Sequence, residues 1–155
     1  MKLSEGVEWG VHCAALLALA PPGVAVRREF MAAHYGLPDA YLGKNLQALA
    51  RAGILHSVPG PHGGYRLARP ASRITMLDVV TALEGSASVF TCQEIRQHGS
   101  GALPPAECVR PCTVDAVMKQ AENAWRSTLR SVTVAELADR LPADVRKRNE
   151  RLLGG

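Results

Sequence analysis

The sequence predicts a mainly α-helical fold with one small β-hairpin. Apolar residues recur at helical spacing over residues 3–19 and 113–132. Between these stretches, two short runs with strand character flank a turn cluster rich in glycine and proline at residues 59–64. The chain has 155 residues, of which 47% are hydrophobic and 21% are charged. That is enough for one domain with an appendage, and it excludes a wholly disordered chain.

Three helices are expected before the hairpin. Residues 3–19 form the first, which ends at a Pro-Pro-Gly run. The second covers residues 26–35, and Gly36 is a suitable residue to end it. Two short helices joined by a tight turn containing glycine match the helix-turn-helix pattern. The third helix ends at Gly53 and turns one apolar face inward, formed by Leu42, Leu46 and Leu49.

A hairpin follows the third helix directly. Residues 54–58 and 65–68 read as its two strands. A helix-turn-helix followed by a hairpin is the winged-helix layout. The next helix is expected over residues 76–83, where Thr75 and Asp78 have the spacing of a capping box.

The pattern divides the chain into four segments. Residues 1–85 form the winged helix-turn-helix domain. Residues 86–112 contain three of the four cysteines and no consistent apolar period, so a functional loop is expected there. Residues 113–141 predict a long helix with one apolar stripe, followed by a short helix. Residues 142–155 are charged and then rich in glycine, and we expect a flexible tail.

The charge of the chain permits an anionic partner. The net charge is +4, and residues 1–70 carry seven basic and four acidic side chains. A basic excess on a helix-turn-helix predicts binding to double-stranded DNA, since phosphate contacts supply much of the affinity. The side chains expected at the DNA come from the second and third helices and the hairpin: Arg28, Tyr41, Lys44, Gln47, His62, Gly63 and Arg66.

Two other classes of protein are not expected. The chain has no nucleophile–base motif, phosphate-binding loop or dinucleotide fingerprint, which argues against an enzyme. Its apolar run at residues 14–20 is far shorter than the roughly 20 residues that span a bilayer, so no membrane partner is expected. We therefore expect a cytoplasmic protein, in which clustered thiols are more often metal ligands or redox-active groups than disulfides.

Three stretches together carry a specific series of motifs. Residues 41–55 contain Ala-Gly, residues 61–68 contain Gly-Gly-Tyr-Arg-Leu-Ala, and residues 74–85 end in Leu-Glu-Gly. The series resembles the iron–sulfur-sensing winged-helix transcriptional repressors, the family of IscR and NsrR, over residues 1–132. The resemblance implies a homodimer held by the long helix, two winged heads on a DNA operator, and a cluster whose state controls operator binding. One departure is His62, where relatives usually carry Arg or Lys before the glycines.

The cysteine loop also departs from the family pattern of three closely spaced cysteines. Cys108 and Cys112 form a C-x₃-C pair that can place two thiolates on one metal. Cys92 precedes Cys108 by a gap of fifteen residues, and we expect it to be structural rather than a ligand. Cys13, on the apolar face of the first helix, is expected in the core.

The first helix supplies the remaining ligand candidates. Glu8 and His12 share one face at i and i+4, and carboxylate and imidazole both ligate iron. A surface carboxylate–imidazole pair is the alternative. Together with the C-x₃-C pair, the pattern most resembles the redox-sensitive RsrR type, which implies a [2Fe-2S] cluster held by Glu8, His12, Cys108 and Cys112. Trp9 is either a switch that responds to the cluster or a rim residue that packs on the partner's helix.

Three alternatives stay open at this point. A [4Fe-4S] cluster that senses nitric oxide or oxygen would recruit Cys92 as a third thiolate. A Cys₂-His-Glu set also suits tetrahedral Zn²⁺. Finally, the thiols of a DNA-binding repressor without a cluster can oxidise directly. Visible absorption of the anaerobically purified protein distinguishes a redox cluster from the colourless alternatives.

Overall fold

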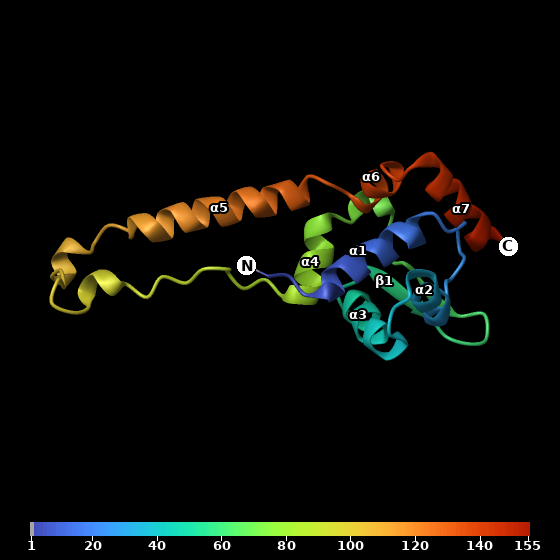
Figure 1. The fold of residues 1–155 in the computed structure, drawn as a ribbon, viewed down its shortest axis with the longest axis horizontal. Helices are drawn as coiled ribbons and strands as arrows, with labels where there is room; N and C mark the ends of the chain where they lie inside the picture. Colours follow the sequence, from blue (N-terminus) through green and yellow to red (C-terminus); the bar gives the residue numbers. More distant parts are fainter. Residues whose placement is uncertain (1) are drawn as a thin grey trace. The chain divides into compact units, whose positions relative to one another are not determined.

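The computed structural model describes residues 2–155 and confirms the predicted fold class (Figure 1). Within them lie seven α-helices, three short 3₁₀ helices and one two-stranded sheet. The chain forms two compact units. Residues 2–85 and 129–155 form the first, called the head, and residues 86–128 form the second, called the cysteine segment.

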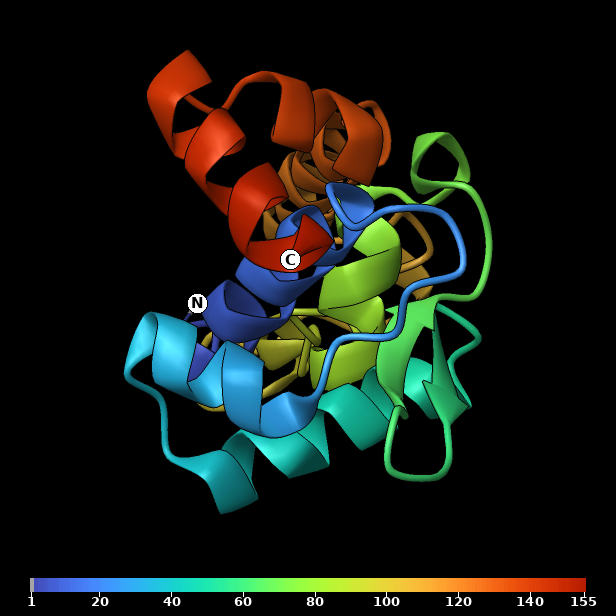
Figure 2. The same cartoon turned by 90° about the vertical axis from the view of Figure 1, so that its right-hand side faces the viewer.

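Helix α1 (Glu5–Ala18) is the central element of the head. It packs against α3, α4, α6 and strand β2, and Figure 2 shows it surrounded by these elements. Its inward face includes Cys13, Ala14 and Leu16, none of which is more than 1% exposed. The prediction that Cys13 belongs to the core is confirmed.

Helices α2 (Arg28–Tyr35) and α3 (Asp39–Arg51) form the expected helix-turn-helix pair. Helix α2 ends at Gly36, whose φ of 64° lies in the left-handed region that favours glycine. The leucine face of α3 points into the core, as predicted, and three side chains on it have no exposed surface: Leu42, Leu46 and Leu49.

The hairpin consists of β1 (Leu55–Val58) and β2 (Gly64–Leu67), which pair antiparallel along their full length. Tyr65 also forms a bridge with Val26, and each residue donates its N–H to the carbonyl of the other at 2.8 Å. This bridge ties the wing to the segment that enters α2.

Two of the remaining helices of the head begin with a capping box. Helix α4 (Met76–Glu84) begins at the predicted box, where the Asp78 N–H donates to Thr75 Oγ1 at 3.1 Å and the Thr75 N–H donates to Asp78 Oδ2 at 2.8 Å. Helix α6 (Val134–Asp139) begins with the same arrangement at Thr133. An antiparallel bridge between Thr75 and Thr133 joins the two turns.

The prediction of a flexible tail at residues 142–155 is wrong. These residues form helix α7 (Ala143–Gly154). Leu153 is only 8% exposed and belongs to the hydrophobic core, and Arg146 forms an ion pair with Asp139 at 2.8 Å. Because apolar residues are few among the charged residues of α7, the sequence pattern does not reveal the face that packs.

The cysteine segment contains most of helix α5 (Thr113–Arg130) and two 3₁₀ helices, Ile95–Gln97 and Pro105–Glu107. Side chains of α5 hold the preceding chain: Glu122 accepts hydrogen bonds from the Ser88 hydroxyl and the Val89 N–H, and Arg126 donates to the carbonyls of residues 86 and 87. Within residues 86–128 Asp115 is the only residue that is buried as a whole.

Candidate nucleic-acid interface and cysteine segment

The outward face of α3 is polar. Tyr41 is 47% exposed, and Lys44 and Gln47 are exposed as well. No ion pair engages Lys44 within residues 2–155. The exposed parts of these three side chains can therefore reach a ligand as large as a duplex, as their position opposite the leucine face predicts.

Arg28, another predicted DNA contact, has partners inside the head. Its Nε and Nη2 each lie 2.8 Å from a carboxylate oxygen of Asp39, and Nη2 lies 3.3 Å from Glu29. The Asp39 carboxylate also raises the pKa of Arg28. A Cβ atom at Gly43 would lie 3.2 Å from Arg28 Cδ, so glycine allows this close packing. Arg28 thus joins the first turns of α2 and α3 and positions the helix pair, and direct contact with DNA stays a prediction.

The wing presents exposed side chains on a tightly packed turn. His62 and Arg66 are exposed, whereas Gly63 is buried. A Cβ atom at Gly63 would lie 2.0 Å from the Val58 carbonyl oxygen, and one at Gly64 would lie 2.3 Å from a backbone oxygen of the segment entering α2. The glycines are required by these approaches, so the predicted role of Gly63 includes shaping the wing.

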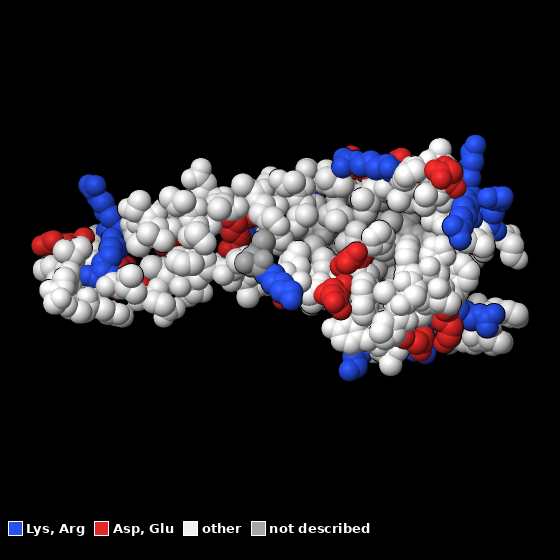
Figure 3. All heavy atoms as spheres, viewed as in Figure 1, with Lys and Arg blue, Asp and Glu red and all other residues white. Residues whose placement is uncertain are grey.

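Cations also gather outside the predicted interface. On the face drawn in Figure 3, Lys and Arg side chains are densest over the end of the head that α7 forms. The charge count over residues 1–70 does not include this group, because the count stops before α7 begins at Ala143. The cations of α7 are Arg146, Lys147, Arg148 and Arg151.

Three predicted site residues on α1 lie together. Glu8 and His12 are exposed, and both line a small surface pocket of about 170 Å³ with Trp9. Trp9 packs edge-to-face against Tyr41, with ring centroids 5.2 Å apart. The spacing argument that placed Glu8 and His12 on one face is confirmed, and Trp9 connects that face with the outward face of α3.

The cysteine segment brings Cys92 close to Cys112, which the spacing of the sequence does not predict. The backbone N–H groups of Asp115 and Val114 hydrogen-bond to the Cys112 sulfur and lower the pKa of its thiol. A hydrogen bond from the Cys92 thiol and the positive charge of Arg96 lower that pKa further. The lowered pKa favours the thiolate form of Cys112, which is the form that binds metals.

Arg96 is a functional candidate that the sequence does not single out. It donates to the Arg110 carbonyl at 3.1 Å and to the Glu94 carboxylate. The Glu94 carboxylate raises the pKa of Arg96, and the nearby charges of Cys108 and Cys112 raise this pKa further. This guanidinium supplies fixed positive charge where thiolates would gather.

The predicted ligand set contains thiolate, carboxylate and imidazole donors, which are all types that ligate iron. The thiols of Cys92, Cys108 and Cys112 are half-buried in the cysteine segment, and a carboxylate and an imidazole share a face of α1 in the head. Within residues 2–155 no three His, Cys, Asp or Glu side chains are arranged to hold one metal ion. The predicted set is thus divided between the two units of the chain.

Comparison with known proteins assigns the chain to a family. Residues 3–140 match the family model Rrf2, described as "Iron-dependent Transcriptional regulator". The chain belongs to the Rrf2 family. It is accordingly a DNA-binding transcriptional regulator and not an enzyme, which confirms both predictions and the resemblance at the level of the family. No helix in the described part of the chain is long and apolar enough to cross a membrane.

Individual Rrf2 relatives align over nearly the whole chain. Protein aau3 of Rhizobium meliloti (strain 1021) is 36% identical over 145 residues, which are 92% of this chain and 88% of that protein. The structure of CymR, the global cysteine regulator of B. subtilis, superposes with a TM-score of 0.71 at 24% identity, over 92% of this chain and 99% of CymR. IscR of T. potens superposes with a TM-score of 0.70 at 24% identity, over 93% of this chain and 90% of that chain. The structures of CymR and IscR thus share their fold with this chain.

Proposed function

We propose that this Rrf2 protein is a redox-responsive regulator of the RsrR type, in which a [2Fe-2S] cluster controls operator binding. The observation that carries the proposal is the contact between Trp9 and Tyr41. It joins the face of α1 that holds two candidate ligands to the face of α3 that holds candidate DNA contacts.

The proposed ligands are Glu8 and His12 of α1 with Cys108 and Cys112 of the cysteine segment. One chain or two chains can supply them. When bound, a [2Fe-2S] cluster takes up or releases one electron, and histidine ligation raises its reduction potential relative to four thiolates. The lowered pKa of Cys112 supports its place in the set, because the thiolate is the ligand form.

The protein's own contribution is to connect the ligand face with the reading face. Trp9 lies between Glu8 and His12 in the sequence, and its ring packs on Tyr41. A change in the setting of α1 therefore reaches α3 through an aromatic contact. Such coupling between two sites typically changes affinity 5- to 150-fold.

We propose that α5 forms a homodimer. Its apolar stripe is exposed in the single chain: Val114 is 60% exposed, Val117 is 58% exposed and Met118 is 39% exposed. Exposed apolar patches of this kind mark association surfaces. A symmetric dimer would place the two α3 helices in major grooves about 34–36 Å apart.

On the operator, we assign base or phosphate contact to side chains on the outward face of α3 and on the wing. Arg28 would act mainly by positioning the helix pair, since Asp39 already holds its guanidinium. The wing would approach the backbone or minor groove through His62. The assigned contacts are Tyr41, Lys44, Gln47, His62 and Arg66.

A [4Fe-4S] cluster that senses nitric oxide or oxygen is a second candidate, favoured by one observation. The Cys92 thiol contacts the Cys112 sulfur, so a third thiolate is available in the same segment. The cluster would then be held by three cysteine thiolates and one oxygen or nitrogen donor.

Absorption spectra of the anaerobically purified protein test the proposal. We expect visible bands that bleach on reduction by one electron per cluster, with two irons and two sulfides per site. Cys112→Ala and Cys108→Ala should abolish the bands, and Glu8→Ala and His12→Ala should shift them. Cys13→Ala is the matched control and should leave the spectrum unchanged.

The remaining outcomes separate the alternatives. Loss of the bands in Cys92→Ala with retention in Cys108→Ala would transfer one ligand position from Cys108 to Cys92. Four irons per site would favour the [4Fe-4S] candidate. A colourless protein, with or without stoichiometric zinc, would contradict an iron–sulfur regulator and favour a zinc- or thiol-switched repressor.

A further inference from the structure

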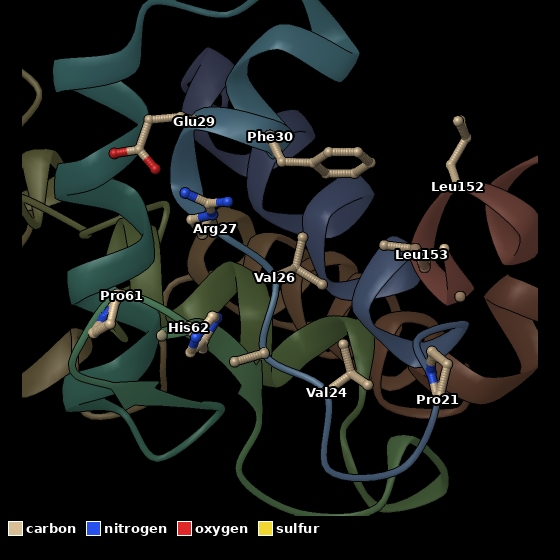
Figure 4. A pocket seen from close by; sticks show the side chains of 14 residues that line it. Pro21, Val24, Val26, Arg27, Glu29, Phe30, Pro61, His62, Leu152 and Leu153 are labelled. Carbon is tan, nitrogen blue, oxygen red and sulfur yellow. The ribbon is translucent and has the colours of Figure 1, made fainter.

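A pocket of about 890 Å³ lies in the head, away from the residues proposed to bind a cluster (Figure 4). Its walls come from the wing turn, the segment that enters α2, the first turn of α2 and the end of α7. The volume lies in the range of small-molecule sites, about 300–1,000 Å³. Helix α7 lies beyond residue 140, where the match to the family model ends, so this wall comes from a part of the chain that the match does not include.

One side of the pocket is apolar. Val24, Phe30 and Leu152 line it together with the more deeply buried Val26 and Leu153. Figure 4 shows the Phe30 ring extending toward the wall that the two leucines form. Val24 is 38% exposed and Leu152 is 47% exposed. These side chains would cover the hydrocarbon part of a small ligand.

The other side of the pocket carries positive charge without a partner. Arg27 lies between Glu29 and His62 in Figure 4, and no hydrogen bond or ion pair engages its side chain within residues 2–155. Glu29 is held instead by Arg28 at 3.3 Å. A guanidinium with five free donors matches a carboxylate in geometry and charge.

We infer that this pocket binds a small organic acid with a short aliphatic or aromatic body. The carboxylate lies against Arg27 and His62, and the hydrocarbon body lies against Phe30 and Leu152. The site is separate from the proposed cluster ligands, and it acts on DNA binding by a different route.

The position of the pocket connects its occupant to the wing. Pro61, His62 and Gly63 line it, and the Val26–Tyr65 bridge fixes the other wall to β2. An acid seated on Arg27 and His62 therefore touches the wing turn directly. Because the His62 side chain cannot serve the acid and the operator at once, binding of the acid weakens binding of DNA.

Calorimetric titration of the full chain with hexanoate tests the site, with hexanamide as the uncharged control. We expect hexanoate to bind at least tenfold more tightly than hexanamide, because charge-assisted hydrogen bonds to Arg27 are lost with the amide. Arg27→Gln should reduce hexanoate to the affinity of the amide. Lys147→Gln, which removes a cation of α7 outside this pocket, should change nothing.

Leu152→Ala tests the apolar wall on a side chain that is about half-exposed, so the fold is retained. It should weaken both ligands by the same factor. Amide NMR shifts on hexanoate binding should include Arg27, Gly63 and Leu152. No binding by millimolar hexanoate, equal binding of acid and amide, or shifts confined to other parts of the head would overturn the inference.

Discussion

The head and the cysteine segment bury their side chains in opposite ways. In the head, Leu42, Leu46 and Leu49 have no exposed surface. In the cysteine segment only Asp115 is buried, and Val117 of α5 is 58% exposed. The head is stabilised by its own core, whereas the apolar and thiol groups of the segment are left for other partners. A regulator needs both kinds of region: one that folds through its own core, and one whose exposed groups bind partners.

The largest expected effect is on association through the segment. Val117→Asp places a charge in the exposed apolar stripe of α5 and should convert a dimer into a monomer in sedimentation experiments. The circular dichroism of the head should stay unchanged. Asn123→Asp, at another exposed position of α5 that lies away from the stripe, is the control and should stay dimeric. A dimer that survives Val117→Asp would place the interface elsewhere.

Leu46→Ala should destabilise the head strongly. Removing a fully buried leucine costs about 2–5 kcal/mol of the free energy of unfolding, through lost burial and the cavity left behind. Val114→Ala in α5 is the matched change at a side chain that is 60% exposed, and in the monomeric Val117→Asp background it should cost under about 0.5 kcal/mol. Urea unfolding measures both. Equal losses would show that the segment also has a core of its own.

The Cys13 thiol should make the head unstable at alkaline pH. Burial raises its pKa in the folded state from 9.0 to about 12. Its contribution to stability is therefore complete below pH 9 and is lost as the pH rises toward 12, by about 1.4 kcal/mol per pH unit. Urea unfolding of the wild type and Cys13→Ala across this range measures it. A slope that is the same in both proteins would contradict the assignment.

The smallest effect concerns the helix caps. Thr75→Ala should cost about 1 kcal/mol, because the N–H of Asp78 loses its acceptor at the start of α4. Thr75→Ser should restore most of this loss. At the start of α5 in the metal-free protein, we expect Cys112→Ser to retain the helicity, because a serine hydroxyl accepts hydrogen bonds from backbone N–H groups as the Cys112 sulfur does. Thermal unfolding followed by circular dichroism measures these changes.

Local signals in the sequence were sufficient for most of the head. The leucine spacing of α3, the glycine after α2 and the capping box at Thr75 each depend on residues close together in the chain, so pattern and structure agree. Helix α7 could not be predicted from such local signals. Its stability depends on Leu153 reaching the core and on the ion pair from Arg146 to Asp139, and neither contact is visible in a local pattern.

The candidate site was predictable only in part for the same reason. Glu8 and His12 share a face because they are four positions apart on one helix, with three residues between them. The contact between Cys92 and Cys112 spans the whole loop, and the C-x₃-C spacing pointed to Cys108 instead. The pocket beside Arg27 combines the wing with α7, so no single stretch of sequence encodes it.

Redox control is tested most directly by the affinity of one protein preparation for one duplex before and after reduction. The duplex is selected by the anaerobic protein from a random library, and the salt concentration is held fixed, since phosphate contacts make affinity depend on salt. We predict a 5- to 150-fold change in affinity that Trp9→Ala reduces without removing the visible bands. Equal affinities of the oxidised and reduced forms would contradict redox control of operator binding.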